Sequence, residues 1–76
     1  MATFYGHVRS NGQLTEDSSG QSFSTAKEAC ADAAKSMPKL LERSLQPDGN
    51  AYVTTEVRDE DRTVCVVRGS VILENR

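Results

Sequence analysis

The sequence predicts an α+β fold, in which one helix packs on one face of a four-stranded antiparallel sheet in the order strand, strand, helix, strand, strand. One apolar stripe has helical spacing, and its members are Ala26, Cys30, Ala33, Met37, Leu40, Leu41 and Leu45. The segments before and after this stripe alternate between apolar and polar residues, which is the period of a β-strand. One helix must therefore cover one sheet, within a single domain of residues 1–76.

The segment from Thr3 to Arg9 predicts the first strand, because its side chains alternate in character. The residues that we expect on the core face of this strand are Phe4, Gly6 and Val8. Asn11 and Gly12 follow this strand and predict a tight hairpin, since both tolerate the positive φ angles of primed turns.

A weakly apolar stretch separates this hairpin from the helix. We expect a short second strand at residues 13–15 and a loop at 16–20. The last strand-like segment, residues 21–23, is expected to be an edge or irregular.

The start of the helix is marked by Thr25 and Glu28, which have the S/T-x-x-E spacing of a capping box. Pro38 interrupts the hydrogen-bond ladder, because it lacks an N–H group. The stripe keeps its phase beyond Pro38, so we expect either a kinked helix or two end-to-end pieces. Residues 47–49, Pro-Asp-Gly, predict the end of the helix.

Two further strands are predicted after the helix. In the segment 51–59, the side chains expected to face the core are Val53, Thr55 and Val57. A charged turn follows at 59–62, and the fourth strand runs from residue 63 through Gly69 to residue 73. Gly69 predicts a bulge or bend in this strand.

The composition indicates a soluble globular domain, with 37% hydrophobic and 26% charged residues and no apolar run long enough to cross a bilayer. The N-terminus has neither a basic region nor an apolar core of a signal peptide, so we expect a cytoplasmic location. A chain of 76 residues buries a small core, which makes a homodimer compatible with the sequence although no single residue indicates one.

The two cysteines are expected to be buried free thiols, since Cys30 belongs to the helix stripe and Cys65 lies in a valine-rich strand. Both side chains point toward the same predicted core, which leaves a disulfide open. His7 is the only histidine and is expected on the polar face of the first strand. A nucleophile, a base and a group that orients the base are therefore not found together, and we predict no enzyme and no catalytic residue.

Metal and cofactor sites are not expected either. Asp59 and Asp61 resemble the start of a calcium loop, but the positions that require glycine and glutamate hold Val64 and Ser70. A single histidine and two isolated cysteines do not form a zinc cluster, and no glycine-rich phosphate loop occurs.

The strongest local concentration of charge is a group of four carboxylates, Glu56, Asp59, Glu60 and Asp61. One interpretation is a solvated hairpin tip that prevents edge pairing. The other is a binding patch for a basic protein surface, together with the exposed sheet face that carries Tyr52. On the second interpretation the protein is a non-enzymatic binding module, with one concrete form an inhibitor that blocks a nucleic-acid-processing complex.

The alternative hypothesis is a nucleic-acid-binding accessory domain. Its contacts would be Lys35, Lys39 and Arg43, which recur at spacing four along the helix, with Arg68 nearby. A pI of about 5.2 and the scattering of the nine basic residues argue against direct binding of nucleic acid.

The chain resembles a family of small bacterial domains of unknown function, many of which are encoded as stand-alone proteins. The matching motifs are Phe4-Tyr5-Gly6-His7-Val8-Arg9, Asn11-Gly12, Asp17, Gly20, the alanine-rich segment Ala26 to Ala34, and Val57-Arg58-Asp59-Glu60-Asp61. The chain departs from that family at His7, where an acidic residue is usual, and at Pro38. The family provides no catalytic residues to carry over. The element order is also similar to that of antitoxin domains, and the size and charge are similar to those of phage-encoded anti-CRISPR inhibitors.

Overall fold

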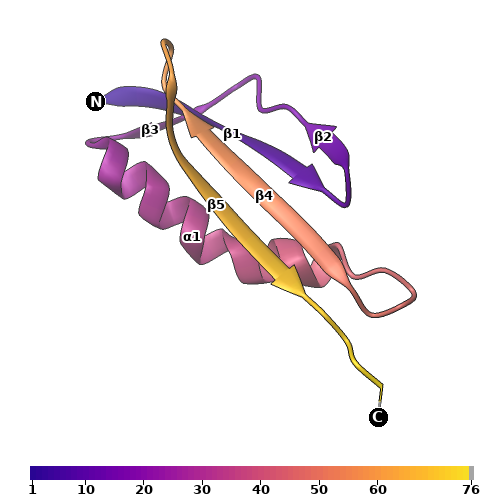
Figure 1. Ribbon diagram of the computed structural model, residues 1–76. Coiled ribbons are helices and arrows are strands. Elements are labelled where there is room, and N and C mark those ends of the chain that lie inside the picture. The colour runs from indigo at the N-terminus through magenta and orange to yellow at the C-terminus, as the bar shows by residue number, and fades with distance from the viewer. Residues whose placement is uncertain (76) are drawn as a thin grey trace.

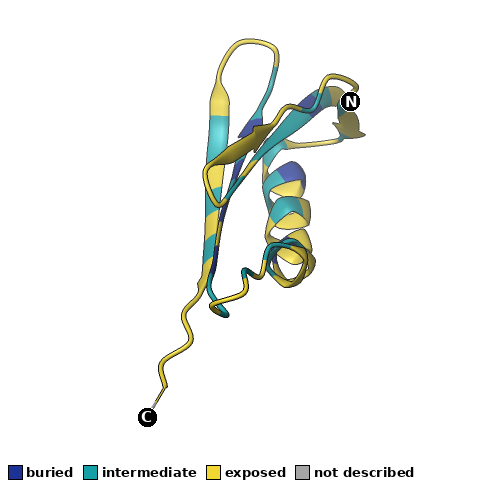
Figure 2. Ribbon diagram, turned by 90° about the vertical axis from the view of Figure 1, so that its right-hand side faces the viewer, coloured by how far each residue is buried: buried dark blue, intermediate teal, exposed yellow. Residues whose placement is uncertain are grey.

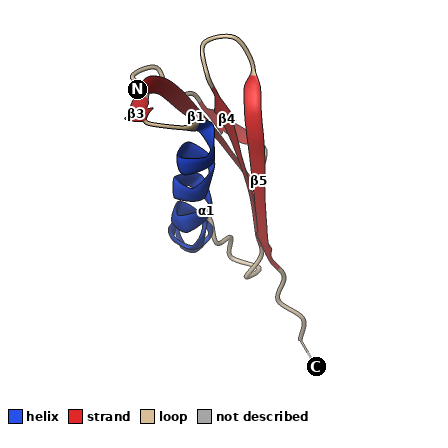
Figure 3. Ribbon diagram, turned by 90° about the vertical axis from the view of Figure 1, so that its left-hand side faces the viewer, coloured by secondary structure: helices blue, strands red, loops and turns tan. Residues whose placement is uncertain are grey.

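The computed structural model describes residues 1–75 and contains five strands and one helix (Figure 1). In chain order the elements are β1 Ala2–Ser10, β2 Gln13–Thr15, β3 Gln21–Phe23, α1 Ala26–Arg43, β4 Ala51–Arg58 and β5 Thr63–Val71. The antiparallel sheet has the main order β2-β1-β4-β5, and β3 pairs with β1 as well. The α+β prediction is confirmed, with α1 on one face of the sheet (Figure 3). The segment that we expected to be an edge or irregular, β3, pairs with β1. It brings the sheet to five strands, where we predicted four.

The hairpin between β1 and β2 has the predicted primed turn. Asn11 and Gly12 adopt φ angles of 50° and 90°, both in the region that these two residue types tolerate best. The Asn11 side chain also accepts a hydrogen bond from the Tyr52 N–H at 3.0 Å and donates one to the Ser44 carbonyl at 2.7 Å. The turn is thereby tied to the end of α1 and the start of β4.

The helix begins as the capping box predicts. The Thr25 hydroxyl accepts a hydrogen bond from the Glu28 N–H at 3.2 Å. The Glu28 carboxylate reaches back to the Ser24 N–H at 3.3 Å, one residue before the cap. Two amides at the helix entry are thus satisfied by side chains.

The helix runs through Pro38 as one continuous element of 18 residues, so it is not split into two pieces. Pro38 and Ala34, whose carbonyl loses its helical donor, both lie on the exposed side, where water can replace that donor. The helix ends at Arg43, and the Ser44 N–H closes it by bonding to carbonyls of the last turn. The prediction that Leu45 belongs to the apolar stripe of the helix was therefore wrong. Leu45 follows the helix and is exposed.

The core lies between α1 and the strands β1, β4 and β5 (Figure 2). Its buried apolar residues are Phe4, Ala29, Met37, Ala51, Val53 and Val57. Strand β4 alternates as predicted, with its odd-numbered residues buried. Ala29 has only 3% of its surface exposed although the predicted stripe omitted it. No helix in the described part of the chain has the length and apolar character needed to span a bilayer.

α1 lies close to the sheet at Gly69. A β-carbon at this position would lie 2.8 Å from the Met37 sulfur and 3.0 Å from a Leu41 methyl carbon. The bulge predicted at Gly69 was wrong, because Gly69 pairs with Val53 in regular register and the register shift lies at the other end of the β4–β5 pair. Strand β5 also ends earlier than expected, at Val71. Glycine at this site serves helix packing.

A disulfide joins Cys30 of α1 to Cys65 of β5, with the two α-carbons 6.3 Å apart. Cys30 lies on the sheet-facing side of the helix, and Cys65 occupies an inward position opposite Val57. The expected free thiols are thus wrong, because the two side chains meet where the helix crosses β5.

Removing the disulfide should destabilise the fold. It closes a loop with a sequence separation of 35 residues, and a loop of this length contributes about 3–4 kcal/mol by restricting the unfolded chain. We expect the free energy of unfolding in urea to fall by a similar amount in the Cys30→Ala, Cys65→Ala double variant and in the dithiothreitol-treated protein. An unfolding curve that reductant leaves unchanged, together with rapid alkylation of both thiols in the native protein, would contradict the bond.

Gly69→Ala should lower the free energy of unfolding by about 1–2 kcal/mol, because the added methyl group must displace Met37 and Leu41. Gly6→Ala is the matched control, since its β-carbon meets only a Thr55 methyl at an ordinary 3.8 Å. Both free energies are measurable by urea denaturation. Equal effects of the two substitutions would contradict close packing at Gly69.

Candidate functional site

The sheet face that turns away from α1 is not covered by any other element among the described residues (Figure 2). Three apolar side chains on this face keep large exposed fractions, namely Leu14 at 48%, Tyr52 at 50% and Val66 at 41%. They come from three different strands, β2, β4 and β5. We call this surface the open face.

Polar and charged side chains lie beside Leu14 and Val66 in a shallow hollow of about 440 Å³, and they include His7, Arg9, Glu16, Glu56, Arg58 and Arg68. Tyr52 lines a neighbouring depression together with Arg68. Arg9 and Arg68 both pair with Thr54 in the strand register, one from each neighbouring strand. One arginine therefore lies on each side of β4.

Glu56 is held by its neighbours on the open face. Its carboxylate forms an ion pair with Arg58 at 3.4 Å and accepts a hydrogen bond from the Thr63 hydroxyl. The Thr63 hydrogen bond is the main cause that lowers the pKa of Glu56, and the positive charge of Arg58 adds to it. Glu56 therefore stays ionised and partly neutralises the arginines around it.

The five residues predicted to bind a partner do not form one surface. Tyr52 and Glu56 lie on the open face, two strand periods apart. Asp59 shapes the turn between β4 and β5, because its carboxylate accepts the N–H groups of Asp61 and Arg62, both at 2.8 Å. These backbone hydrogen bonds lower the pKa of Asp59. Of the predicted residues in this turn, Glu60 and Asp61 are exposed, and Arg62 beside them is exposed as well.

The basic residues of the alternative hypothesis are not brought together. Lys35, Lys39 and Arg43 are exposed on α1. Arg68 lies on the opposite side of the sheet, among the arginines of the open face. The strand arginines Arg9 and Arg58 had not been singled out from the sequence, because only the sheet register shows that they share a face.

Strand β1 has a gap along its outer edge. β2 pairs with residues 8–10 of β1 and β3 pairs with residues 2–4, so no strand faces the middle of β1 on that side. The loop 16–20 passes this gap and returns to the sheet at β3.

Asp17 fills the gap in place of a strand. Its carboxylate accepts the Gly6 N–H at 3.1 Å and the Gly20 N–H at 3.0 Å, and its own N–H donates to His7 Nδ1 at 3.1 Å. The hydrogen bonds from Gly20 and Gly6 lower the pKa of Asp17. Gly20 has a φ of 73°, and a β-carbon there would lie 2.6 Å from a Thr3 methyl. The spacing Asp17-x-x-Gly20 is the sequence signal for this anchored loop.

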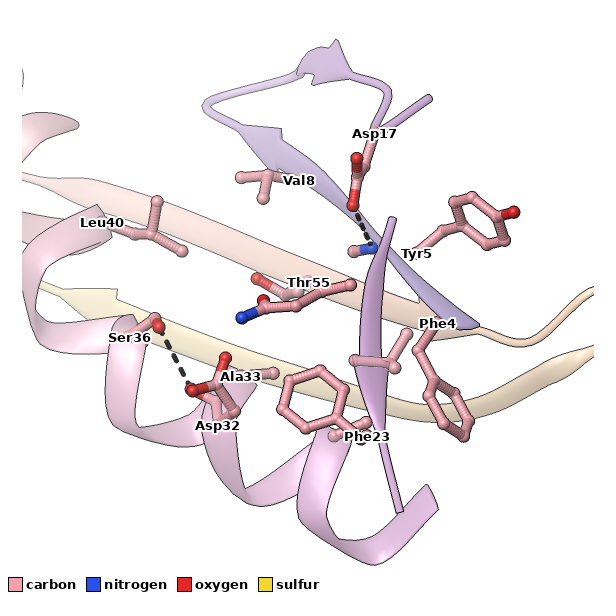
Figure 4. A pocket seen from close by; sticks show the side chains of 14 residues that line it. Phe4, Tyr5, Val8, Asp17, Phe23, Asp32, Ala33, Ser36, Leu40 and Thr55 are labelled. Carbon is pink, nitrogen blue, oxygen red and sulfur yellow. Dashed lines mark hydrogen bonds between the residues drawn. The ribbon is translucent and has the colours of Figure 1, made fainter. Parts of the chain in front are cut away.

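A cleft of about 260 Å³ opens on the other side of the sheet, between α1 and β1 (Figure 4). Thr55 of β4 lies at this cleft, with 4% of its surface exposed and no hydrogen-bond partner for its hydroxyl among the described residues. A buried polar atom left without a partner costs about 1–3 kcal/mol. From the sequence Thr55 was predicted only as a core position of its strand.

Among the described residues there is neither a free cysteine nor a metal centre. Both cysteines are consumed by the disulfide. His7 uses Nδ1 to accept the Asp17 N–H and faces Glu56 across the β1–β4 pair. Among residues 1–75, no three His, Cys, Asp or Glu side chains are grouped so that they could hold a metal ion.

The model of a protein family described as a domain of unknown function (DUF6894) matches residues 3–69. The chain belongs to this family. The matched part of the DUF6894 domain contains the disulfide, Asp17, Thr55 and the residues of the open face. No curated protein and no solved structure matched the chain. The resemblance to a family of small domains of unknown function is thus confirmed, whereas the likeness to antitoxins and anti-CRISPR inhibitors finds no support.

Replacing Asp17 should lower the stability of the DUF6894 domain in a pH-dependent way. Because the pKa of Asp17 is lower in the folded than in the unfolded state, its carboxylate stabilises the fold above about pH 4, and this contribution is lost as pH falls through the lowered pKa. We expect Asp17→Asn to lower the free energy of unfolding by about 1–2 kcal/mol at pH 7, as measured in urea. On acidification the free energy of unfolding of this variant should fall less than that of the wild type.

Asp32→Asn is the control for this series, since the Asp32 side chain forms no hydrogen bond within residues 1–75. Its unfolding free energy should follow that of the wild type at each pH. A variant at Asp17 that is as stable as the wild type at pH 7 would show that the loop does not depend on this carboxylate.

Proposed function

We propose that the DUF6894 domain is a non-enzymatic protein-binding module and that its contact surface is the open face. The observation that carries this proposal is an uncovered sheet face on which exposed Leu14, Tyr52 and Val66 lie among arginines. Tyrosine and arginine are the side chains most enriched at the energetic centres of protein interfaces. A patch of apolar groups with a polar rim has the anatomy of such an interface.

The charge of the open face indicates the chemistry of the partner. Arg9, Arg58 and Arg68 outnumber the carboxylates of Glu16 and Glu56 on this surface, although the whole chain has a net charge of −2. A complementary partner surface would therefore combine apolar side chains with carboxylates. The exposed acidic tip, Glu60 and Asp61, is the second candidate contact and would suit a basic partner, as an inhibitor of a nucleic-acid-processing complex requires.

Binding of single-stranded nucleic acid is the alternative that a specific observation favours. Arg68 lines the same shallow depression as exposed Tyr52, and a basic side chain beside an aromatic ring is an element of a base-stacking platform. The acidic residues of the same face and the low pI argue for the protein partner.

Tyr52→Ala and Arg68→Glu should each weaken partner capture by about tenfold or more, which is the effect of losing one central interface residue. The measurement is cross-linking and mass spectrometry of proteins retained from a lysate of the source cells, followed by calorimetry with the purified partner. Both side chains are exposed, so circular dichroism of the two variants should match that of the wild type.

The matched comparison is the Glu60→Gln, Asp61→Gln variant at the acidic tip, which should retain partner capture. Loss of capture in this variant alone would place the contact at the tip and overturn the open-face proposal. Retention of a labelled oligonucleotide on a filter at low salt, abolished by Arg68→Glu, would instead identify the partner as nucleic acid.

A further inference from the structure

The cleft between α1 and β1 lies on the face of the sheet opposite to the open face. α1 packs mainly on β4 and β5 and has few contacts with β1. The cleft opens between α1 and β1 (Figure 4). The apolar side chains that line it include Phe4, Val8, Phe23, Ala33 and Leu40. Phe4 and Phe23 form one end, with their rings edge to face and their centroids 6.1 Å apart.

The Thr55 hydroxyl is the unexplained polar group of this cleft. Its residue is 96% buried, at 4% exposure, and the hydroxyl oxygen has no hydrogen-bond partner within residues 1–75. Figure 4 shows the Thr55 side chain directed into the space between the helix and β1. Valine has nearly the same shape and would fill this position without a buried, unsatisfied polar atom. The hydroxyl is thus suited to a polar atom of a bound molecule.

The charges that line the cleft are all negative. Asp17 and Asp32 contribute carboxylates, and among residues 1–75 no lysine, arginine or histidine lines the cleft. Asp17 is held as an anion by the amides of Gly6 and Gly20, and Asp32 is exposed at the opposite side, on α1. A molecule that fits between them should carry a positive charge, because a cation is attracted by both carboxylates and an anion is repelled.

The volume limits the size of the ligand. An engineered protein cavity of about 150 Å³ lined by apolar side chains binds benzene. At about 260 Å³ this cleft has room for one aromatic ring with a short chain, and the Phe4 and Phe23 rings offer it aromatic contacts. We propose that the cleft binds a small arylalkylamine, whose ring packs on these phenylalanines, whose ammonium group lies near Asp17 and Asp32, and whose hydroxyl bonds to Thr55.

Three commercially available probes separate the parts of this proposal. Tyramine has the ring, the amine and a hydroxyl, 2-phenylethylamine lacks the hydroxyl, and 4-ethylphenol lacks the amine. Titration of the ¹⁵N-labelled full chain, followed by NMR, should shift the amide signals of Phe4, Ala33 and Thr55. Tyramine should bind about five- to tenfold more tightly than either of the other two probes.

Two variants test the named side chains. Thr55→Val should weaken tyramine binding about five- to tenfold and leave 2-phenylethylamine unchanged, which is the signature of a hydroxyl contact. Asp32→Asn should weaken both amines and leave 4-ethylphenol unchanged. Thr55→Val removes an unsatisfied buried hydroxyl, so the variant should be at least as stable as the wild type in urea unfolding, and a binding loss would not reflect unfolding.

Tyr52→Ala serves as the control from the open face and should leave tyramine binding unchanged, which separates this site from the proposed protein-binding surface. Absence of shifts at millimolar tyramine would overturn the ligand class. Equal weakening of tyramine and 2-phenylethylamine by Thr55→Val would overturn the role of the hydroxyl. Binding of 4-ethylphenol as tight as that of tyramine would overturn the role of the carboxylates.

Discussion

The close approach of α1 to β4 and β5 sets the arrangement of the domain. Gly69 leaves the space that Met37 and Leu41 occupy, and the Cys30–Cys65 bond fixes the helix to β5 close by. A helix drawn to this half of the sheet cannot also cover β1. The position of the cleft beside β1 follows from that one contact.

The second constraint is the edge of β1, where two three-residue strands leave a gap between them. A carboxylate fills this gap, because Asp17 accepts backbone amides from both sides of it. An extended strand would satisfy the same amides without bringing a charge to the cleft. Asp17 therefore connects the architecture of the sheet edge with the electrostatics of the cleft, and a change at this residue would affect both.

The small size of the domain does not prevent it from presenting surfaces of different character. The open face is rich in arginine, the turn between β4 and β5 carries exposed carboxylates, and the cleft is apolar with acidic residues along it. The net charge of −2 averages over these regions and describes none of them. Recognition at one surface can thus be independent of recognition at another, since a sheet separates the cleft from the open face.

Local signals in the sequence predict the helix, the first hairpin and the buried face of β4. The Thr25–Glu28 capping box, the primed turn at Asn11-Gly12 and the alternation along β4 each involve residues within a few positions of one another. Features that depend on residues far apart in the chain are visible only in the folded structure. The disulfide spans 35 positions, the arginines of the open face come from three strands, and the isolation of the Thr55 hydroxyl depends on where α1 crosses the sheet. Periodicity shows which face of a strand is buried, but strand register and helix placement determine which side chains meet there.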